Sequence, residues 1–219
     1  MKPAFIVTVH QGSNRLNGHK LLDQYLTTLS SSLKIPYDVF IMENGSDTTY
    51  TFDRNYFYTY FPNQNGGMTK CWNAGVTMAI RNGNDFICVT NEDLAFNETI
   101  NNFFDDITKF PHYHDAVFGP ICDNPSTFAP QRGNAPSNKL VDITGADKPI
   151  HGWFLGFSME YFNKYRDTDG MLFDRSRPWR GQESFQQRDW QKGSKSVVVH
   201  SCLIHHEHFG DWRKVEHIM

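Results

Sequence analysis

The amino-acid sequence predicts an α/β fold, an α/β/α sandwich in which helices cover both faces of a mostly parallel central sheet. Apolar runs of strand length alternate with segments whose apolar residues recur at helical spacing. Such alternation is typical of βαβ units and of the parallel sheets that they build. The chain has 219 residues, the size of one domain, and we expect a single domain over residues 1–219.

The first half of the chain supplies most of these elements. Residues 5–9 are a continuous apolar run, the pattern of a buried strand, and residues 16–33 place leucines at helical spacing until Pro36 ends the unit. In chain order, we expect a strand over 5–9, a helix over 16–33, strands over 37–42 and 56–60, a helix over 68–81, a strand over 86–90, a helix over 100–110 and a strand over 116–119.

The character of the sequence changes after Pro120. Residues 122–148 are rich in Pro, Asn, Ser and Gly, and this segment is too long for a passive connector. We interpret it as a lid or an acceptor loop. Beyond it we expect a strand over 152–157, helices over 159–165 and 183–192, and a strand over 196–204 that runs into four residues, His205-His206-Glu207-His208.

Composition excludes several classes of protein. The net charge of -3 offers no electrostatic footprint for nucleic acid. The four cysteines are far apart without a CxxC pair, which argues against a zinc ribbon or a dithiol site and suits a reducing compartment. The apolar run at 4–9 is too short for a signal sequence, and no stretch approaches a membrane span. These features predict a cytoplasmic protein.

Two motifs point to a nucleotide site. Residues 65–75, Asn-Gly-Gly-Met-Thr-Lys-Cys-Trp-Asn-Ala-Gly, open the helix predicted over 68–81, and the next strand ends on Asn91-Glu92-Asp93. A strand that ends in carboxylates beside a glycine-led helix can hold a metal and a nucleotide diphosphate at the carboxyl edge of a sheet. The alternative is an acidic surface turn that caps the following helix.

The order of motifs resembles that of the family 2 glycosyltransferases, which have the GT-A fold. The resemblance spans nearly the whole chain and rests on the order and spacing of several motifs. The matching segments are Thr8-Val9-His10, Glu43-Asn44-Gly45-Ser46, the Asn65-x-Gly67-x-x-x-Cys71-x-Asn73-x-Gly75 pattern with Cys in place of the usual Ala, Asn91-Glu92-Asp93 at the Asp-x-Asp position, Gly152-Trp153, and Gly181 to Arg188.

The resemblance implies a nucleotide-sugar site in residues 1–93 and an acceptor-binding, catalytic half in residues 94–219. Thr8 and Glu43 would lie side by side and hold the base and ribose, while Lys70 and Asn73 would project toward the donor. Ordinary turn chemistry for Glu43 and a solvated side chain for Lys70 are the alternatives. The donor-binding candidates are Thr8, His10, Glu43, Asn65, Gly67, Lys70, Asn73, Asn91 and Trp153.

The resemblance also implies a Mn²⁺ or Mg²⁺ ion held by Asp93, with His206 or His208 as a further ligand. Hard oxygen ligands suit both ions. Asn91 replaces the first Asp of the motif, and a neutral amide is the weaker ligand. The histidines could instead be exposed, or bind zinc adventitiously.

Glu183 is the candidate general base, because it opens a helix where the family carries an acidic pair. The sequence reads Gln-Glu-Ser there, so the register is open by one residue, with Asp189 and Asp174 as the fallback candidates. A first-turn acid that interacts with the helix dipole is the alternative.

The expected reaction is inverting, metal-dependent transfer of a hexose from a nucleoside diphosphate sugar, a UDP-sugar first, to a hydroxyl of a glycan or another acceptor. One rival is a nucleotidyltransferase, although the Gln11-Gly-Ser-Asn-Arg15 loop is only faintly of the glycine-rich, basic kind that such an enzyme needs. The other rival is a GT-A module that binds nucleotide sugars without catalysis, as Asn91 would permit.

Overall fold

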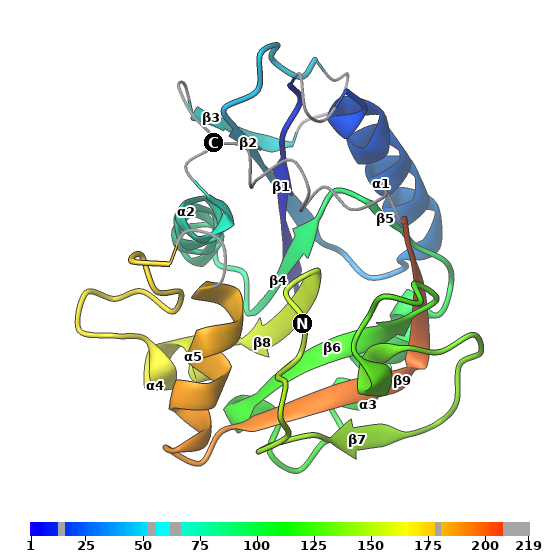
Figure 1. Cartoon of the computed structure of the whole chain (residues 1–219), viewed down its shortest axis with the longest axis vertical. Helices are drawn as coiled ribbons and strands as arrows, with labels where there is room; N and C mark the ends of the chain where they lie inside the picture. Colours follow the sequence, from blue (N-terminus) through cyan, green and yellow to red (C-terminus); the bar gives the residue numbers. More distant parts are fainter. Residues whose placement is uncertain (13–15, 52–55, 62–66, 178–180, 208–219) are drawn as a thin grey trace.

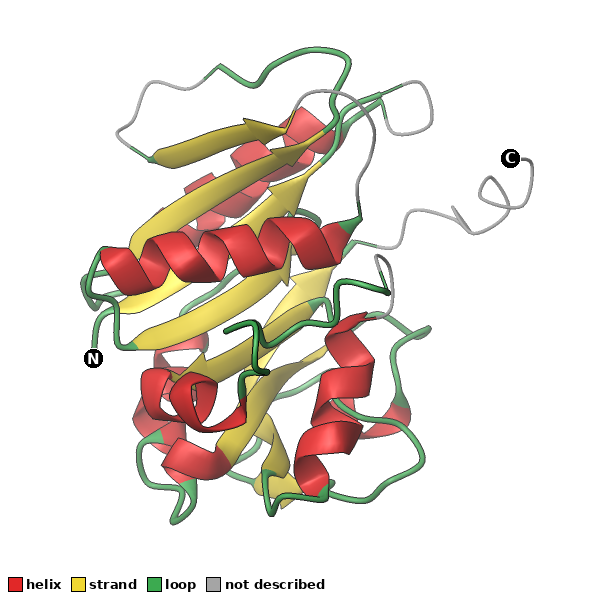
Figure 2. Cartoon of the chain, turned by 90° about the vertical axis from the view of Figure 1, so that its left-hand side faces the viewer, coloured by secondary structure: helices red, strands yellow, loops and turns green. Residues whose placement is uncertain are grey.

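A single mixed sheet organises the chain, with helices on both of its faces (Figures 1 and 2). The computed structural model describes residues 1–12, 16–51, 56–61, 67–177 and 181–207, without the side chains of 181–183. The strands follow one another across the sheet in the order β3-β2-β1-β4-β8-β6-β9-β5, and β7 pairs with β9.

The elements of the first half match the sequence prediction closely. They are β1 (Pro3–Val9), α1 (Gly18–Ser32), β2 (Asp38–Asn44), β3 (Phe57–Phe61), α2 (Met68–Arg81), β4 (Phe86–Asn91), the two-residue β5 (Leu94–Ala95), α3 (Ile100–Ile107) and β6 (Ala116–Cys122). The later elements are the short 3-10 helix η2 (Ala129–Gln131), β7 (Leu140–Asp142), β8 (Phe154–Ser158), α4 (Met159–Tyr165), α5 (Gly181–Trp190) and β9 (Lys195–His206); a second 3-10 turn, η1 (Tyr113–Asp115), precedes β6.

The strands β3, β2, β1 and β4 are parallel, as the sequence predicts. The α/β class is therefore confirmed. The register sets Thr8 of β1 opposite Met42 of β2 on one side and opposite Asn91 of β4 on the other. The carboxyl ends of β1 and β4 thus meet at one edge of the sheet.

The rest of the sheet is mixed, where the sequence analysis expected mostly parallel strands. β8 lies between β4 and β6 and runs antiparallel to both, and β5 and β7 run antiparallel to β9. The reason is the entry point of β8: its first residue, Phe154, pairs with Thr90 near the carboxyl end of β4. The chain is already at that edge, so it can descend antiparallel without the crossover that a parallel neighbour requires.

Two apolar cores lie on the two faces of the sheet. On one face the leucines of α1 and the phenylalanines of α3 cover Phe5, Val7 and Val9 of β1. On the other face α2 covers Ile6, α4 and α5 contribute residues to the same core, and Trp72 is fully buried there. Alternate residues of β1 enter opposite cores, which explains why its sequence is apolar throughout.

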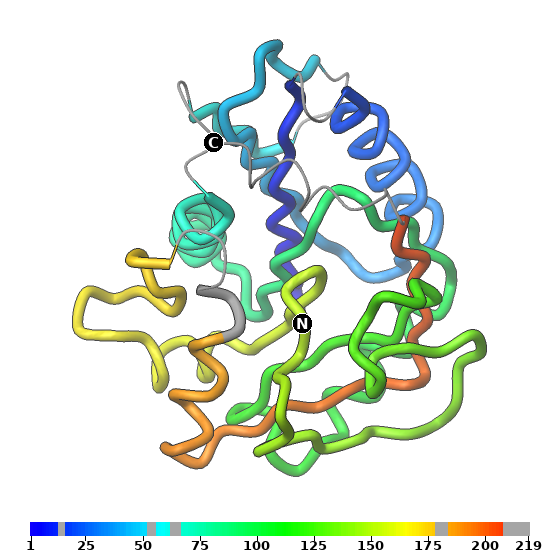
Figure 3. Tube along the Cα trace, viewed as in Figure 1, coloured from blue at the N-terminus to red at the C-terminus, as the bar shows by residue number. Residues whose placement is uncertain are grey.

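The segment 123–149 contains little regular structure apart from η2 and β7, in keeping with its composition. In Figure 3 it runs out past β9 and returns to the middle of the sheet, where it leads into β8. The four cysteines are all buried and free. Within the described ranges, no helix is long and apolar enough to cross a membrane.

Gly75 lets α2 approach β1 closely. A Cβ atom at this position would lie 2.3 Å from Cγ2 of Ile6, well inside van der Waals contact. We expect Gly75→Ala to lower the free energy of unfolding by about 1–3 kcal/mol, because overpacking outweighs the better helix propensity of alanine. Chemical denaturation measures this, and in an Ile6→Ala background, which removes the clashing atoms, Gly75→Ala should cost much less. Equal costs in both backgrounds would contradict the explanation.

Candidate functional site

The carboxyl edge of β1 and β4 carries buried polar atoms without partners. Thr8 and Asn91 are register neighbours there. Among the described residues, neither Thr8 Oγ1 nor Asn91 Oδ1 has a hydrogen-bond partner, and both atoms are buried. Buried polar atoms normally have hydrogen-bond partners. Two neighbouring atoms without partners at a sheet edge therefore indicate a position where a ligand or water binds.

Asp93 and His206 come together next to this pair. The short strand β5 aligns with the end of β9, and the backbone N–H of Glu207 donates to the Asp93 carbonyl at 2.9 Å. As a result His206 Nε2 lies 3.4 Å from Asp93 Oδ1, with both side chains mostly buried. Burial opposes the charged imidazole, but Asp93 and the Cys122 thiol outweigh it and raise the pKa of His206 to about 9. A cation bound between the two side chains would have to displace this imidazole proton, because only neutral imidazole is a metal ligand.

Trp153 closes the same site. Its ring stacks on the His206 imidazole with centroids 5.3 Å apart, and its carbonyl accepts from the Asn91 N–H at 3.1 Å. Trp153 is only 4% exposed, and its indole N–H has no partner in the described part of the chain. Trp153 is one of the donor-binding candidates of the sequence; one face of its ring already contacts His206, and its N–H is the group left for a ligand.

The spacing of Asp93 and His206 is compatible with a divalent cation whose other ligands come from a substrate. Adjacent ligand atoms of a six-coordinate ion with metal–ligand distances near 2.1 Å lie about 3.0 Å apart, close to the 3.4 Å that separates Asp93 Oδ1 and His206 Nε2. The described residues contain no group of three or more His, Cys, Asp or Glu side chains that could hold a metal. A cation here would need further oxygens from a ligand, or a residue outside the described ranges such as His208.

Asp123 is a member of this edge that sequence analysis missed. Its carboxylate lies 2.6 Å from His205 Nδ1 and accepts from the His206 N–H at 3.1 Å. This anchors the end of β9 and so holds the His206 side chain opposite Asp93. The available signal was that Asp123 directly follows β6, a strand that ends at this edge.

Glu43 is buried on the other face of the sheet from Thr8. Because Thr8 is opposite Met42, Glu43 is opposite Val9, and its side chain enters the α1 core. The expectation that Thr8 and Glu43 lie side by side in one pocket is therefore wrong, because neighbouring register positions point to opposite faces.

The Glu43 carboxylate is held by the protein itself. It lies 2.6 Å from His19 Nε2, accepts from the Tyr50 N–H at 2.9 Å and accepts a short bond from the Tyr58 hydroxyl. Burial raises the pKa of Glu43, but the donors, Tyr50 first, outweigh burial and lower it. The Glu43 carboxylate is therefore already engaged in intramolecular hydrogen bonds. Its contact with a base or ribose stays a prediction.

The lowered pKa of Glu43 predicts a pH effect on stability. A carboxyl group whose pKa is lower in the folded state stabilises that state above its unfolded pKa, about 4.3, and the contribution is lost as the pH falls toward the folded value. We expect Glu43→Gln to cost about 1–3 kcal/mol at pH 7, because its NH₂ would face a donor. Chemical denaturation at pH 7 and pH 3 should show that the difference in unfolding free energy between the variant and wild type is smaller at pH 3. The exposed Glu98→Gln serves as control, and a gap that does not change with pH would contradict the assignment.

Three donor-binding candidates, Gly67, Lys70 and Asn73, lie at or near the start of α2. Gly67 precedes the helix with a φ of 83°, a conformation that favours glycine, and the Lys70 side chain is exposed with Nζ 5.2 Å from the centroid of Phe61. Asn73 does not project toward a donor as expected. Its amide donates to the Phe173 carbonyl at 2.9 Å and accepts from the Phe173 N–H at 3.3 Å, which ties α2 to the 170s segment.

The remaining candidates divide between described and undescribed residues. His10 follows β1, and its Nδ1 lies 3.0 Å from the Asn44 carbonyl oxygen. Asn65, His208 and the side chain of Glu183 lie outside the described residues. Of the two fallback bases, Asp189 is buried and bonded to Arg188 and Tyr161, whereas Asp174 is half-buried beside Ser176 and Arg177.

Solved structures share this architecture. The S. aureus TarS fragment 1–349 in complex with UDP matches with a TM-score of 0.61 and 14% identity, over 94% of this chain and 60% of that one. Its complex with UDP-GlcNAc matches with a TM-score of 0.59 and 14% identity, over 97% and 61%. GalNAc-T7 with UDP, GalNAc and Mn²⁺ matches with a TM-score of 0.61 and 11% identity, over 94% and 44%.

The fold is GT-A-like. No family profile and no curated sequence matches the chain. It spans about 60% of the TarS fragment and less than half of GalNAc-T7. At 11–14% identity these likenesses establish the GT-A fold alone, and the chemistry has to be argued from this chain's own residues.

Proposed function

We propose that the chain is a glycosyltransferase that moves a hexose from a nucleoside diphosphate sugar, a UDP-sugar first, to an acceptor hydroxyl. The observation that carries the proposal is the group of unpartnered buried atoms of Thr8, Asn91 and Trp153 next to the Asp93–His206 pair, at the carboxyl edge of a GT-A-like sheet. Ligands of open α/β sheets bind outside this edge. The structural neighbours with UDP and UDP-GlcNAc support a uridine nucleotide.

Asp93 and His206 would hold a divalent cation together with the diphosphate oxygens. The Mn²⁺ in the GalNAc-T7 complex supports this choice of ion. A bound cation would neutralise the negative charge that develops on the departing diphosphate. In this chain Asp93 supplies the anionic ligand, while Trp153 and Asp123 hold His206 in place.

Proton removal from the acceptor is assigned to Glu183. A carboxylate near the acceptor hydroxyl, on the face of the sugar opposite the leaving group, gives inversion of configuration. The burial of Asp189 supports Glu183 over this rival, because Asp189 is committed to Arg188 and Tyr161.

A thermal-shift panel tests the donor site. UDP, GDP, dTDP, CDP and ADP are each added with and without Mn²⁺. Ligand at about 100 times its dissociation constant adds about 2.7 kcal/mol, which raises the melting temperature of a chain of this size by roughly 5–10 °C. We expect UDP with Mn²⁺ to give the largest shift. A shift that ignores Mn²⁺ would favour a non-catalytic module, and no shift with any nucleotide would contradict the proposal.

A further inference from the structure

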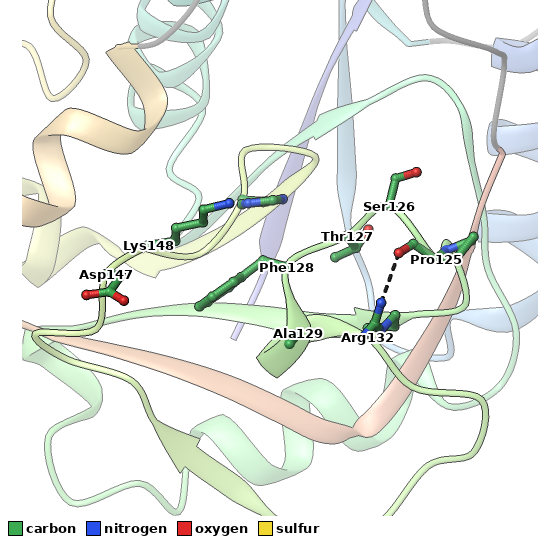
Figure 4. Close-up of a pocket in the computed structure, with 9 residues that line it drawn as sticks. Pro125, Ser126, Thr127, Phe128, Ala129, Arg132, Asp147 and Lys148 are labelled. Carbon is green, nitrogen blue, oxygen red and sulfur yellow. Dashed lines mark hydrogen bonds between the residues drawn. The ribbon is translucent and has the colours of Figure 1, made fainter.

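A cavity with a mixed polar and apolar lining lies in the segment that connects β6 to β8. Its volume is about 460 Å³, enough for a monosaccharide-sized ligand (Figure 4). Two stretches of the otherwise irregular 123–151 segment form its walls. The lining residues are Pro125, Ser126, Thr127, Phe128, Ala129, Arg132, Asp147, Lys148 and His151.

Both walls are anchored at the donor edge. The first wall follows Asp123, which contacts His205 and His206, and its Thr127 hydroxyl lies 3.1 Å from the Cys122 thiol at the end of β6. The second wall ends at His151, two residues before Trp153, which stacks on His206. The cavity therefore opens next to the atoms assigned to the donor.

Buried amides hold the two walls in fixed relation. The side chain of Gln131 is fully buried and accepts from the His151 N–H at 2.7 Å. Gln186 of α5 accepts from the Ile150 N–H at 3.2 Å and donates to the Ile150 carbonyl at 2.8 Å. Phe128 stacks on the His151 ring with centroids 5.7 Å apart. The cavity is thus preformed, which lowers the entropic cost of binding.

The lining carries two cations and one acid, on a chain whose net charge is -3. Arg132 uses one guanidinium nitrogen to donate to the Pro125 carbonyl at 3.1 Å, and its side chain is otherwise exposed. Figure 4 shows the Asp147 carboxylate and the Lys148 side chain directed to different sides. Burial first, then Lys148 and His206, lowers the pKa of His151, so a neutral imidazole completes the lining.

We propose that this cavity binds the acceptor, and that the acceptor carries a phosphate or carboxylate group held by Arg132 or by Lys148, which lie at opposite ends of the lining. The inference rests on the proposed transferase function and names the class of its acceptor. A guanidinium matches two oxygens of either anion, and an ammonium adds a point charge. Phe128, half-buried, offers an apolar wall, and the Ser126 and Thr127 hydroxyls and the His151 imidazole can bond sugar hydroxyls.

The test measures binding of three probes by ligand-observed NMR: glucose 6-phosphate, glucuronate and neutral glucose. Wild type is compared with Arg132→Gln, Lys148→Gln and Arg132→Lys, and with Arg81→Gln, which removes an exposed cation from α2. We expect an anionic probe to bind wild type more tightly than glucose does. At least one of the two Gln variants should weaken anion binding about tenfold, Arg132→Lys should weaken it less than Arg132→Gln, and Arg81→Gln should have no effect.

The two anionic probes separate a phosphate site from a carboxylate site. Three results would each overturn the proposal. Glucose could bind wild type as tightly as both anionic probes do, both Gln variants could bind the anionic probes as wild type does, or wild type could bind neither anionic probe. UDP with Mn²⁺ is titrated on the same samples, so that the failure of the two proposals can be told apart. Anion binding without any UDP binding would overturn the transferase function and leave the anion site standing.

Discussion

Replacing Asp93 by Asn should lower the transfer rate at least about 100-fold, equivalent to about 2.7 kcal/mol of transition-state stabilisation. The substitution keeps the shape of the side chain and removes its charge. Asp93 is the only carboxylate that the described structure places against His206 Nε2, at 3.4 Å, so its charge is not replaced by a neighbour there. The stabilising effect of Mn²⁺ on UDP binding should disappear with it.

The matched control is Asp105→Asn, an exposed carboxylate on α3. It should leave transfer and Mn²⁺ dependence unchanged. Steady-state kinetics and UDP titrations with and without Mn²⁺ measure both properties. An Asp93→Asn variant that keeps its rate and its metal dependence would show that this edge does not hold the reacting diphosphate.

Replacing Glu183 by Gln should lower kcat about 10²–10⁴-fold, the usual contribution of a general base, while UDP binding stays intact. A neutral amide cannot accept the proton of the acceptor hydroxyl. The acidic limb of the pH–rate profile should therefore vanish along with the rate. This separates loss of a base from loss of folding, which would affect UDP binding too.

Asp174→Asn is the informative comparison, because Asp174 is the more accessible of the two alternative bases. Its variant should keep kcat within a few-fold. If Asp174→Asn loses the rate and Glu183→Gln does not, the base has been assigned to the wrong residue. A loss in both would point to a shared structural effect of the segments that lead into and form α5.

The strands β1, β2 and β4 could be predicted because each is a nearly continuous apolar run, which only a strand buried on both faces requires. The direction of β8 could not be predicted in this way. Its sequence is equally apolar, and only its entry at the carboxyl edge makes it antiparallel. The two residues of β5 are too few for a periodic signal, yet they set Asp93 against His206.

The site was partly predictable for a related reason. Asp93 and His206 each follow a strand pattern, which placed both near a sheet edge, but their meeting was implied only by the family resemblance. A sequence pattern does not show which hydrogen bonds a polar side chain makes within the folded protein. Glu43 and Asn73 fit a donor-binding motif, but the fold uses Glu43 to bind Tyr50 and Asn73 to bind Phe173. Asp123 sits in the irregular segment, where no periodicity marked it.

The most direct test of the central claim is to identify the phosphorus product by ³¹P NMR after the protein is incubated with UDP-hexoses, Mn²⁺ and a mixture of sugar acceptors. We expect release of UDP, formed at a rate that falls in Asp93→Asn. Formation of UTP and a sugar phosphate when pyrophosphate is added would instead show nucleotidyl transfer. That result, or an intact UDP-hexose pool that binds the protein without turnover, would contradict a glycosyltransferase.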